Sequence, residues 1–262
     1  TSNFTAITMN RIFSGCLFVV GCLATSACGQ WTSAQSVPTT QVQVTTTTEP
    51  EVISASGQRS GAATKAAQEK LLQLGFWLLS PSGKYDETTR QAVMAFQKYY
   101  RLRPTGSMNA ATAYLLNELN VRPVAQTTQG SLAEVDKERQ LLLLVEDGNV
   151  KYVINASTGD DREYVEPDMN TPGVIIRGTA ITPVGKFKTN RERPDGWWVG
   201  DLGQIYRPKY FIGGVAIHGS QTVPAYPASH GCVRVSTAAM DMIWDTNFLP
   251  LGSDVVVYGE IN

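Results

Sequence analysis

The cysteines of this chain limit how its folded part can be held together. Three of the four, Cys16, Cys22 and Cys28, lie near the N-terminus, and residues 29–262 contain only Cys232. A disulfide framework in the folded part of a single chain is therefore excluded. Its stability has to come from a packed apolar core, for which 262 residues with 42% hydrophobic content are sufficient.

Charge limits the partners that the chain can bind. It carries 22 Lys and Arg against 23 Asp and Glu, which gives a formal net charge of -1. No basic field is present for nucleic acid to follow, so we expect no nucleic-acid partner.

Residues 1–28 have the parts of an export signal. Arg11 precedes an apolar run over 12–24, and small residues lead to Cys28. These features are typical of a signal peptide, and the run is shorter than the about 20 residues of a membrane span. The small residues before Cys28 also resemble a lipoprotein processing box, which would add a lipid tether. We expect export to the cell envelope, with lipidation at Cys28 and simple cleavage nearby as alternatives.

Residues 29–60 are expected to form a flexible linker. They consist largely of Thr, Ser, Gln, Val and Pro and show no apolar periodicity, so little of this segment can be buried. A strand-rich piece over 41–44 is the alternative.

Residues 61–120 carry the pattern of three short helices. Ala67, Leu71 and Leu74 recur at helical spacing, and Asp86 and Asn109 stand where N-caps of two further helices belong. The pattern predicts a small helical bundle.

This segment resembles the small peptidoglycan-binding domain that is attached to many wall enzymes. The residues that carry the resemblance include Gln68, Leu71, the run 83–86, and Pro104 to Gly106. It implies binding to the cell wall through exposed groups between the helices. We expect a separate domain that localises the enzyme, so that its deletion spares turnover of small soluble substrates.

Strand signals dominate residues 132–260. The apolar runs 140–145 and 150–154 flank Asp147-Gly148-Asn149, a strong hairpin signal. Further strands are predicted over 173–177, 213–218 and 254–258, and one helix over 237–246 follows Ser236 as a possible N-cap. We predict a mainly β domain.

Both histidines of the sequence fall close to Cys232. His218 ends the run Val-Ala-Ile-His, and eleven residues separate it from His230 in the run Ser229-His230-Gly231-Cys232. Most of a cysteine thiol is protonated at neutral pH, and a neighbouring imidazole can accept its proton and hold it for the leaving group. The grouping predicts a cysteine nucleophile with a histidine base, although the spacing does not decide between the two histidines.

Neighbouring residues can complete such a site. The carbonyl of Gly219 can orient the His218 ring, since no carboxylate lies nearby in the sequence. Gly231 permits a close backbone approach, and amides around Gly231 and Cys232 can face an oxyanion. Arg234 would share a strand face with the cysteine and can pair with a substrate carboxylate.

The run from Ser229 to Arg234, with His218 upstream, resembles the active-site motif of the L,D-transpeptidase family. The segments 157–159 and 182–187 also match, so that the resemblance covers residues 132–260. It implies a β-sandwich-like catalytic domain. The stretch between the two histidines is short, so an extended lid is either missing or supplied by another segment.

The resemblance also implies the roles of the site residues. Cys232 would be the acylated nucleophile and His218 the general base and acid, with His230 and Ser229 in support. The substrate would be a peptidoglycan stem peptide, whose terminal D-alanine leaves as a thioester forms. An amine of a second stem would then give a 3→3 cross-link, without metal or organic cofactor. Carbapenems would acylate the same thiol, and we expect a monomer.

Several alternatives remain open from the residues alone. Cys232 can be a buried structural thiol, or can bind zinc together with His218 and His230. Arg234 can be a structural ion-pair donor. Tyr206 and the pair Trp197-Trp198 can line a substrate groove, although aromatic residues near a β core more often pack. With water as the acceptor, the site would be that of an L,D-carboxypeptidase. A further alternative to the transpeptidase is a non-catalytic protein that anchors to the wall.

Overall fold

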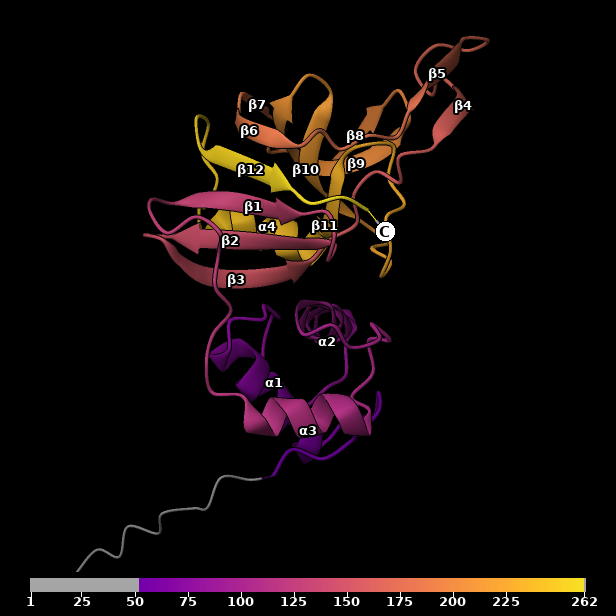
Figure 1. The fold of residues 1–262 in the computed structure, drawn as a ribbon. Coiled ribbons are helices and arrows are strands. Elements are labelled where there is room, and N and C mark those ends of the chain that lie inside the picture. Colours follow the sequence, from indigo (N-terminus) through magenta and orange to yellow (C-terminus); the bar gives the residue numbers. More distant parts are fainter. Residues whose placement is uncertain (1–51, 262) are drawn as a thin grey trace, which may run out of the picture. The chain divides into compact units, whose positions relative to one another are not determined.

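The computed structural model describes residues 52–261, which begin with three helices (Figure 1). The predicted leader, Cys28 and most of the predicted linker lie outside these residues. Helix α1 spans Ala62–Gln73, α2 spans Glu87–Tyr99 and α3 spans Ala110–Glu118. The predicted caps are confirmed, because Asp86 accepts from the Thr89 amide and Asn109 from the Thr112 amide. Among residues 52–261, no helix has the length and apolarity to cross a membrane.

The segment just before α1 packs on the bundle. Ile53 is buried, and its amide donates to the Asn117 side chain of α3 (2.9 Å). Gly57 and Met108 exchange two backbone hydrogen bonds. Ile53 and Gly57 lie at the end of the range expected to be a linker, and the structure places them in contact with the helical bundle.

Two five-stranded sheets and a two-stranded hairpin follow the three helices in the described residues. The first sheet has the order β3-β2-β1-β12-β6, with β1 at Leu132–Asp136, β2 at Leu141–Glu146, β3 at Asn149–Asn155, β6 at Gly185–Lys188 and β12 at Asp254–Tyr258. The second has the order β11-β10-β9-β7 with β8 also paired to β9; its strands are β7 (Arg191–Glu192), β8 (Trp197–Gly200), β9 (Gly203–Ile212), β10 (Val215–Ser220) and β11 (Val233–Ser236). Strands β4 (Glu163–Pro167) and β5 (Ile175–Thr179) make the separate hairpin.

The predicted hairpin over 140–154 is confirmed as β2 and β3. Asp147 and Gly148 form the two-residue turn, and both have positive φ, +50° and +75°. A turn of this kind matches the twist of the paired strands, which explains why Asp-Gly is such a strong signal. The run of leucines in β2 is buried on both faces of the sheet, because successive side chains of a strand point to opposite sides.

One face of β2 contributes to the core between the two sheets. Leu142 and Leu144 pack there with Val255 of β12, Ile217 of β10 and Val233 of β11. Helix α4, Thr237–Asp245, adds Ala239, Met240 and Ile243 to this core, and its predicted cap Ser236 accepts from the Ala239 amide. Two sheets that share one apolar core make a sandwich, so the predicted mainly β fold preceded by a three-helix domain is confirmed.

The other face of β2 belongs to the core of the helical bundle. Leu141 and Leu143, with Val150 and Val153 of β3, pack in one cluster with apolar residues of the helices, among them Phe96. The bundle and the first sheet therefore share a core. The sequence-based picture of the bundle as a separate module is corrected, because helical and strand side chains bury one another.

Polar contacts reinforce this junction. Lys98 of α2 is buried, and its Nζ donates to the carbonyls of Gln140, which precedes β2, and Ala156, which follows β3, at the open end of the hairpin (3.0 Å each). Burial lowers the pKa of Lys98 to about 7. Gln91 of α2 also accepts from the Asn155 side chain.

Candidate active site

Cys232 immediately precedes β11 and lines a cleft of about 840 Å³. It is a free thiol, half-buried. The Ala216 amide donates to its Sγ (3.4 Å), and Sγ lies 3.7 Å from the carbonyl oxygen of Gly214. Gly214 lies in the turn between β9 and β10, and Ala216 lies at the start of β10. The sulfur therefore contacts the backbone of β10, the strand next to β11.

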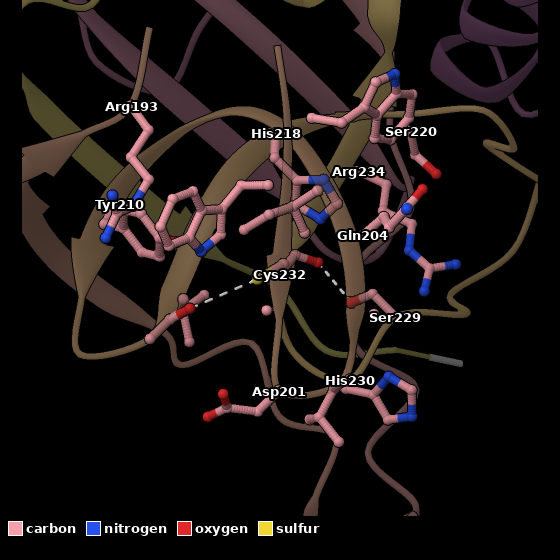
Figure 2. Close-up of a pocket in the computed structure, with 18 of the residues that line it drawn as sticks. Arg193, Asp201, Gln204, Tyr210, His218, Ser220, Ser229, His230, Cys232 and Arg234 are labelled. Atoms are coloured by element: carbon pink, nitrogen blue, oxygen red, sulfur yellow. Dashed lines mark hydrogen bonds between the residues drawn. The ribbon is translucent and has the colours of Figure 1, made fainter. Parts of the chain in front are cut away.

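His218 is on β10, which runs parallel to β11. Its ring is buried, and Nδ1 lies 2.8 Å from the carbonyl oxygen of Gly219. A carbonyl only accepts, so Nδ1 carries the proton and Nε2 keeps its lone pair. This is the ring-orienting contact expected from the sequence. Figure 2 shows the His218 ring directed toward Cys232 in the cleft.

The electrostatics of the site favour neutral forms of both groups. Burial lowers the pKa of His218 to about 4, and nearby Arg234 acts in the same direction against the effect of the Gly219 carbonyl. Burial also raises the pKa of the Cys232 thiol, which the Ala216 amide and Arg234 partly oppose. At neutral pH the pair is a thiol beside an imidazole that is free to accept its proton.

Two segments distant in the sequence position the loop that holds the cysteine. Ser157 pairs with Arg234 through two backbone hydrogen bonds, and the Thr158 carbonyl accepts from the Ser229 amide. Thr182 donates from Oγ1 to the Gly231 carbonyl (2.6 Å) and accepts from the Gly159 amide (2.9 Å). Hydrogen bonds from the Ser157-Thr158-Gly159 segment and from Thr182 therefore fix the position of this loop.

Gly231 is required by the backbone of the loop. Its φ is +131°, and a Cβ at this position would come within 2.7 Å of the Ile181 carbonyl oxygen. The Ser229 hydroxyl accepts from the Gly231 amide (3.0 Å) and donates to the Cys232 carbonyl. The expectation that the Gly231 amide faces an oxyanion is corrected, because Ser229 already occupies it; the Ala216 amide points at the sulfur instead.

His230 lines the same cleft but belongs to different surroundings. Its ring stacks edge-on against Tyr164 of β4 (centroids 4.8 Å apart), and Nε2 lies 3.9 Å from a Glu166 carboxylate oxygen. In Figure 2 the His230 ring points away from His218. Within residues 52–261, no group of three His, Cys, Asp or Glu side chains is placed to hold a metal ion.

The remaining predicted residues are divided between the cleft and its support. Arg234 lines the cleft, and it makes no ion pair with any residue that the structure describes. Tyr206 does not line it: the ring packs beside Trp197, and its hydroxyl donates to Asp241 of α4 (2.9 Å). Gly219 leaves room for this ring, because a Cβ there would approach it to 2.8 Å.

Two hairpins from outside the motif flank the cleft. The loop of the β4–β5 hairpin contacts the β8–β9 turn, since the Met169 amide donates to the Asp201 carbonyl (2.9 Å) and Asn170 donates to the Asp201 carboxylate (2.9 Å). Tyr164 and Asn170 of one hairpin, and Trp197 and Trp198 of the other, line the cleft. Walls of the cleft are thus formed by segments that precede His218 in the sequence.

Several residues of the site were not predicted from the sequence. Gly214, which lines the cleft, and Ala216 contact Cys232 because β10 lies beside β11, and no local pattern in the sequence predicts that pairing. Arg191 and Arg193 line the cleft from β7 and the residue that follows it. Their alternate spacing is the only available signal, and it is too short to separate a strand from a loop.

Comparisons with known proteins agree with this fold. The model of the L,D-transpeptidase catalytic domain (YkuD) matches residues 130–257, and that of the peptidoglycan binding domain matches residues 60–116. No curated protein matches the chain.

Solved structures identify the family. The crystal structure of an L,D-transpeptidase from Xylanimonas cellulosilytica is 42% identical, with a TM-score of 0.69, and the match covers 76% of this chain and 94% of the other. An L,D-transpeptidase from Stackebrandtia nassauensis is 21% identical with a TM-score of 0.42, over 77% of this chain and 93% of the other. On the first of these, the chain belongs to the L,D-transpeptidase family, as the sequence resemblance indicated, and it carries a peptidoglycan-binding domain.

Proposed function

We propose that this protein is an exported peptidoglycan L,D-transpeptidase that forms 3→3 cross-links through a thioester on Cys232. The observation that carries the proposal is that a free thiol, Cys232, lines the same cleft as His218, whose Nδ1 is fixed by the Gly219 carbonyl so that Nε2 is free to accept a proton. Family membership and the peptidoglycan-binding domain support a cell-wall substrate and location.

The proposed reaction has two steps. His218 Nε2 takes the Cys232 proton as sulfur attacks the carbonyl of the third residue of a stem peptide. The oxyanion collapses, the bond to the terminal D-alanine breaks, and His218 returns the proton to the departing amine. A side-chain amine of a second stem then attacks the thioester and gives its proton to His218, which passes it back to the released thiolate. A backbone amide near the sulfur, such as that of Ala216, suits the developing charge.

Incubation with a disaccharide-tetrapeptide tests this function directly. We expect the intact protein to gain the mass of the donor minus D-alanine, and the added mass to map to the fragment that contains Cys232. A carbapenem should form one adduct on the same fragment, because acylation needs only the nucleophile and the amide donors. If neither reagent modifies the protein near neutral pH, the acyl-transfer proposal is wrong. Free tripeptide without any cross-link would assign the carboxypeptidase reaction instead.

The assignment of the base predicts different effects for the two histidines. His218→Ala should slow acylation by roughly 10²-fold or more, and His230→Ala should slow it less. The reacting imidazole is the neutral form, which persists as pH falls until the pKa of His218 near 4 is reached. The acylation rate of the parent should therefore be level from about pH 8 to pH 5 and should halve near pH 4. Stopped-flow or quenched mass measurements across this range check it; a midpoint near 6.5, or a larger effect at His230, would reassign the base.

A further inference from the structure

The segment that contains β7 presents two arginines to the cleft. Arg191 and Arg193 line it, while Glu192 between them points away, as alternation along an extended chain requires. On that other side Glu192 pairs with the buried Lys209 (2.8 Å). The carboxylate nearest to the two arginines in the sequence is therefore already neutralised by another cation.

The cleft as a whole has an excess of positive charge. Arg191, Arg193 and Arg234 line it, and Asp201, which accepts from Asn170, is its one carboxylate. Within residues 52–261, none of the three arginines lies within ion-pair distance of an acidic side chain. A cleft with unpaired guanidinium groups, in a chain whose net charge is -1, is suited to an anionic ligand.

Aromatic rings hold the two arginines of the β7 segment in place. The Arg193 guanidinium carbon lies 3.6 Å from the centroid of the Trp198 ring, and that of Arg191 lies 3.9 Å from the centroid of the Tyr210 ring. Arg191 also reaches the Gly213 carbonyl (3.5 Å). The Nε of Arg193 is buried, and none of the described residues hydrogen-bonds to it. A guanidinium stacked in this way still presents its N–H groups in the ring plane for a carboxylate.

Figure 2 shows Arg193 and Arg234 on opposite sides of Cys232. We propose that Arg234 binds one carboxylate of the stem peptide and that Arg193, assisted by Arg191, binds a second, distinct carboxylate of the same peptide. The cleft would then select peptides that carry free carboxylates on both sides of the carbonyl that Cys232 attacks. This inference rests on the proposed function, and it adds the class of peptide that the site accepts.

The inference is tested by combining amidation of the donor carboxylates with substitution of the arginines. Three tetrapeptide donors are compared: one with all carboxylates free, one amidated at the terminal residue, and one amidated on the acyl side. With the free donor, Arg193→Gln should lower the second-order rate of acyl-enzyme formation by about 10- to 100-fold, through KM, as expected for loss of a charge-assisted hydrogen bond. With one of the two amidated donors, the one that lacks the carboxylate bound by Arg193, the parent and the Arg193→Gln variant should form acyl-enzyme at equal rates. Arg234→Gln should likewise react more slowly than the parent with the free donor, and at the same rate as the parent with the other amidated donor.

Controls separate this inference from the proposed function and from misfolding. Arg177→Gln, an exposed arginine on β5 outside the cleft, should leave all three rates unchanged. Arg193→Lys, which keeps the charge, should recover part of the rate with the free donor. Equal loss with all three donors, or no loss with any, overturns the role of Arg193 while leaving the transpeptidase proposal intact. No acylation of the parent by any donor would instead reject the proposed function itself.

Discussion

A Cys232→Ala variant is expected to form no acyl-enzyme with a tetrapeptide donor or a carbapenem and to fold like the parent. The thiol is the proposed point of covalent attachment, so its removal leaves no atom for the acyl group. Residual cross-linking should fall by at least about 10³-fold, since binding and amide donors alone retain little of the rate. The side chain is half-buried and its sulfur makes two long contacts, so the melting temperature should stay within about 5 °C of the parent.

Intact-mass spectrometry and differential scanning calorimetry measure the two halves of this prediction. Cys232→Ser is the matched variant, because it keeps an oxygen nucleophile of similar size whose proton a neutral imidazole removes far less readily. We expect it to fold normally and to acylate orders of magnitude more slowly than the parent. Adducts on another residue of the alanine variant, such as Ser229, would show that Cys232 is not the attachment point.

Local chemistry made a large part of the fold predictable. Asp147 and Gly148 announce the β2–β3 turn because few residue pairs tolerate two positive φ angles in succession. The caps Asp86, Asn109 and Ser236 were readable because a side-chain oxygen at the first turn satisfies an amide that the helix leaves open. Signals of this kind depend only on residues a few positions apart.

Such local signals do not predict which strands pair when the strands are distant in the sequence. The parallel ladders β1–β12 and β10–β11 join segments that no local turn connects. The four consecutive leucines of β2 were interpreted only as one strand of a hairpin, and a continuous apolar run does not by itself reveal that the second face of the strand packs against the helices. The packing of the bundle against the first sheet was therefore not predicted, although the apolar side chains of β2 that take part in it are evident in the sequence.

The candidate site was predicted where its residues are close together in the sequence. Cys232, His230 and Ser229 are nearly consecutive, and the Gly219 carbonyl follows directly on His218. The availability of the Gly231 amide was judged wrongly, because the hydrogen bond from that amide to Ser229 depends on how the loop folds back on itself.

Removal of the helical bundle is expected to destabilise the catalytic domain, which reverses the expectation drawn from the sequence. Deleting residues 52–123 would expose Leu141, Leu143, Val150 and Val153, all of which are at most 5% exposed in the structure. At about 2 kcal/mol for each buried side chain, the loss is about 8 kcal/mol, comparable with the about 5–15 kcal/mol that stabilises a typical domain. Gln91 of α2 also donates to the Val223 carbonyl in the loop between His218 and Cys232, so the bundle also contacts the segment that leads to Cys232.

A truncated chain that begins at residue 124 should therefore be insoluble, or should melt at least about 15 °C below the full chain, and should lose acylation of soluble donors along with its fold. Replacing the four newly exposed side chains, as Leu141→Thr, Leu143→Thr, Val150→Thr and Val153→Thr, should restore solubility, because threonine keeps strand propensity without apolar surface. In the full chain, Tyr114→Ala changes an exposed bundle residue and should leave melting and acylation unchanged. A truncated chain that melts cooperatively at the parental temperature and acylates at the parental rate would mean that the catalytic domain does not depend on the shared core.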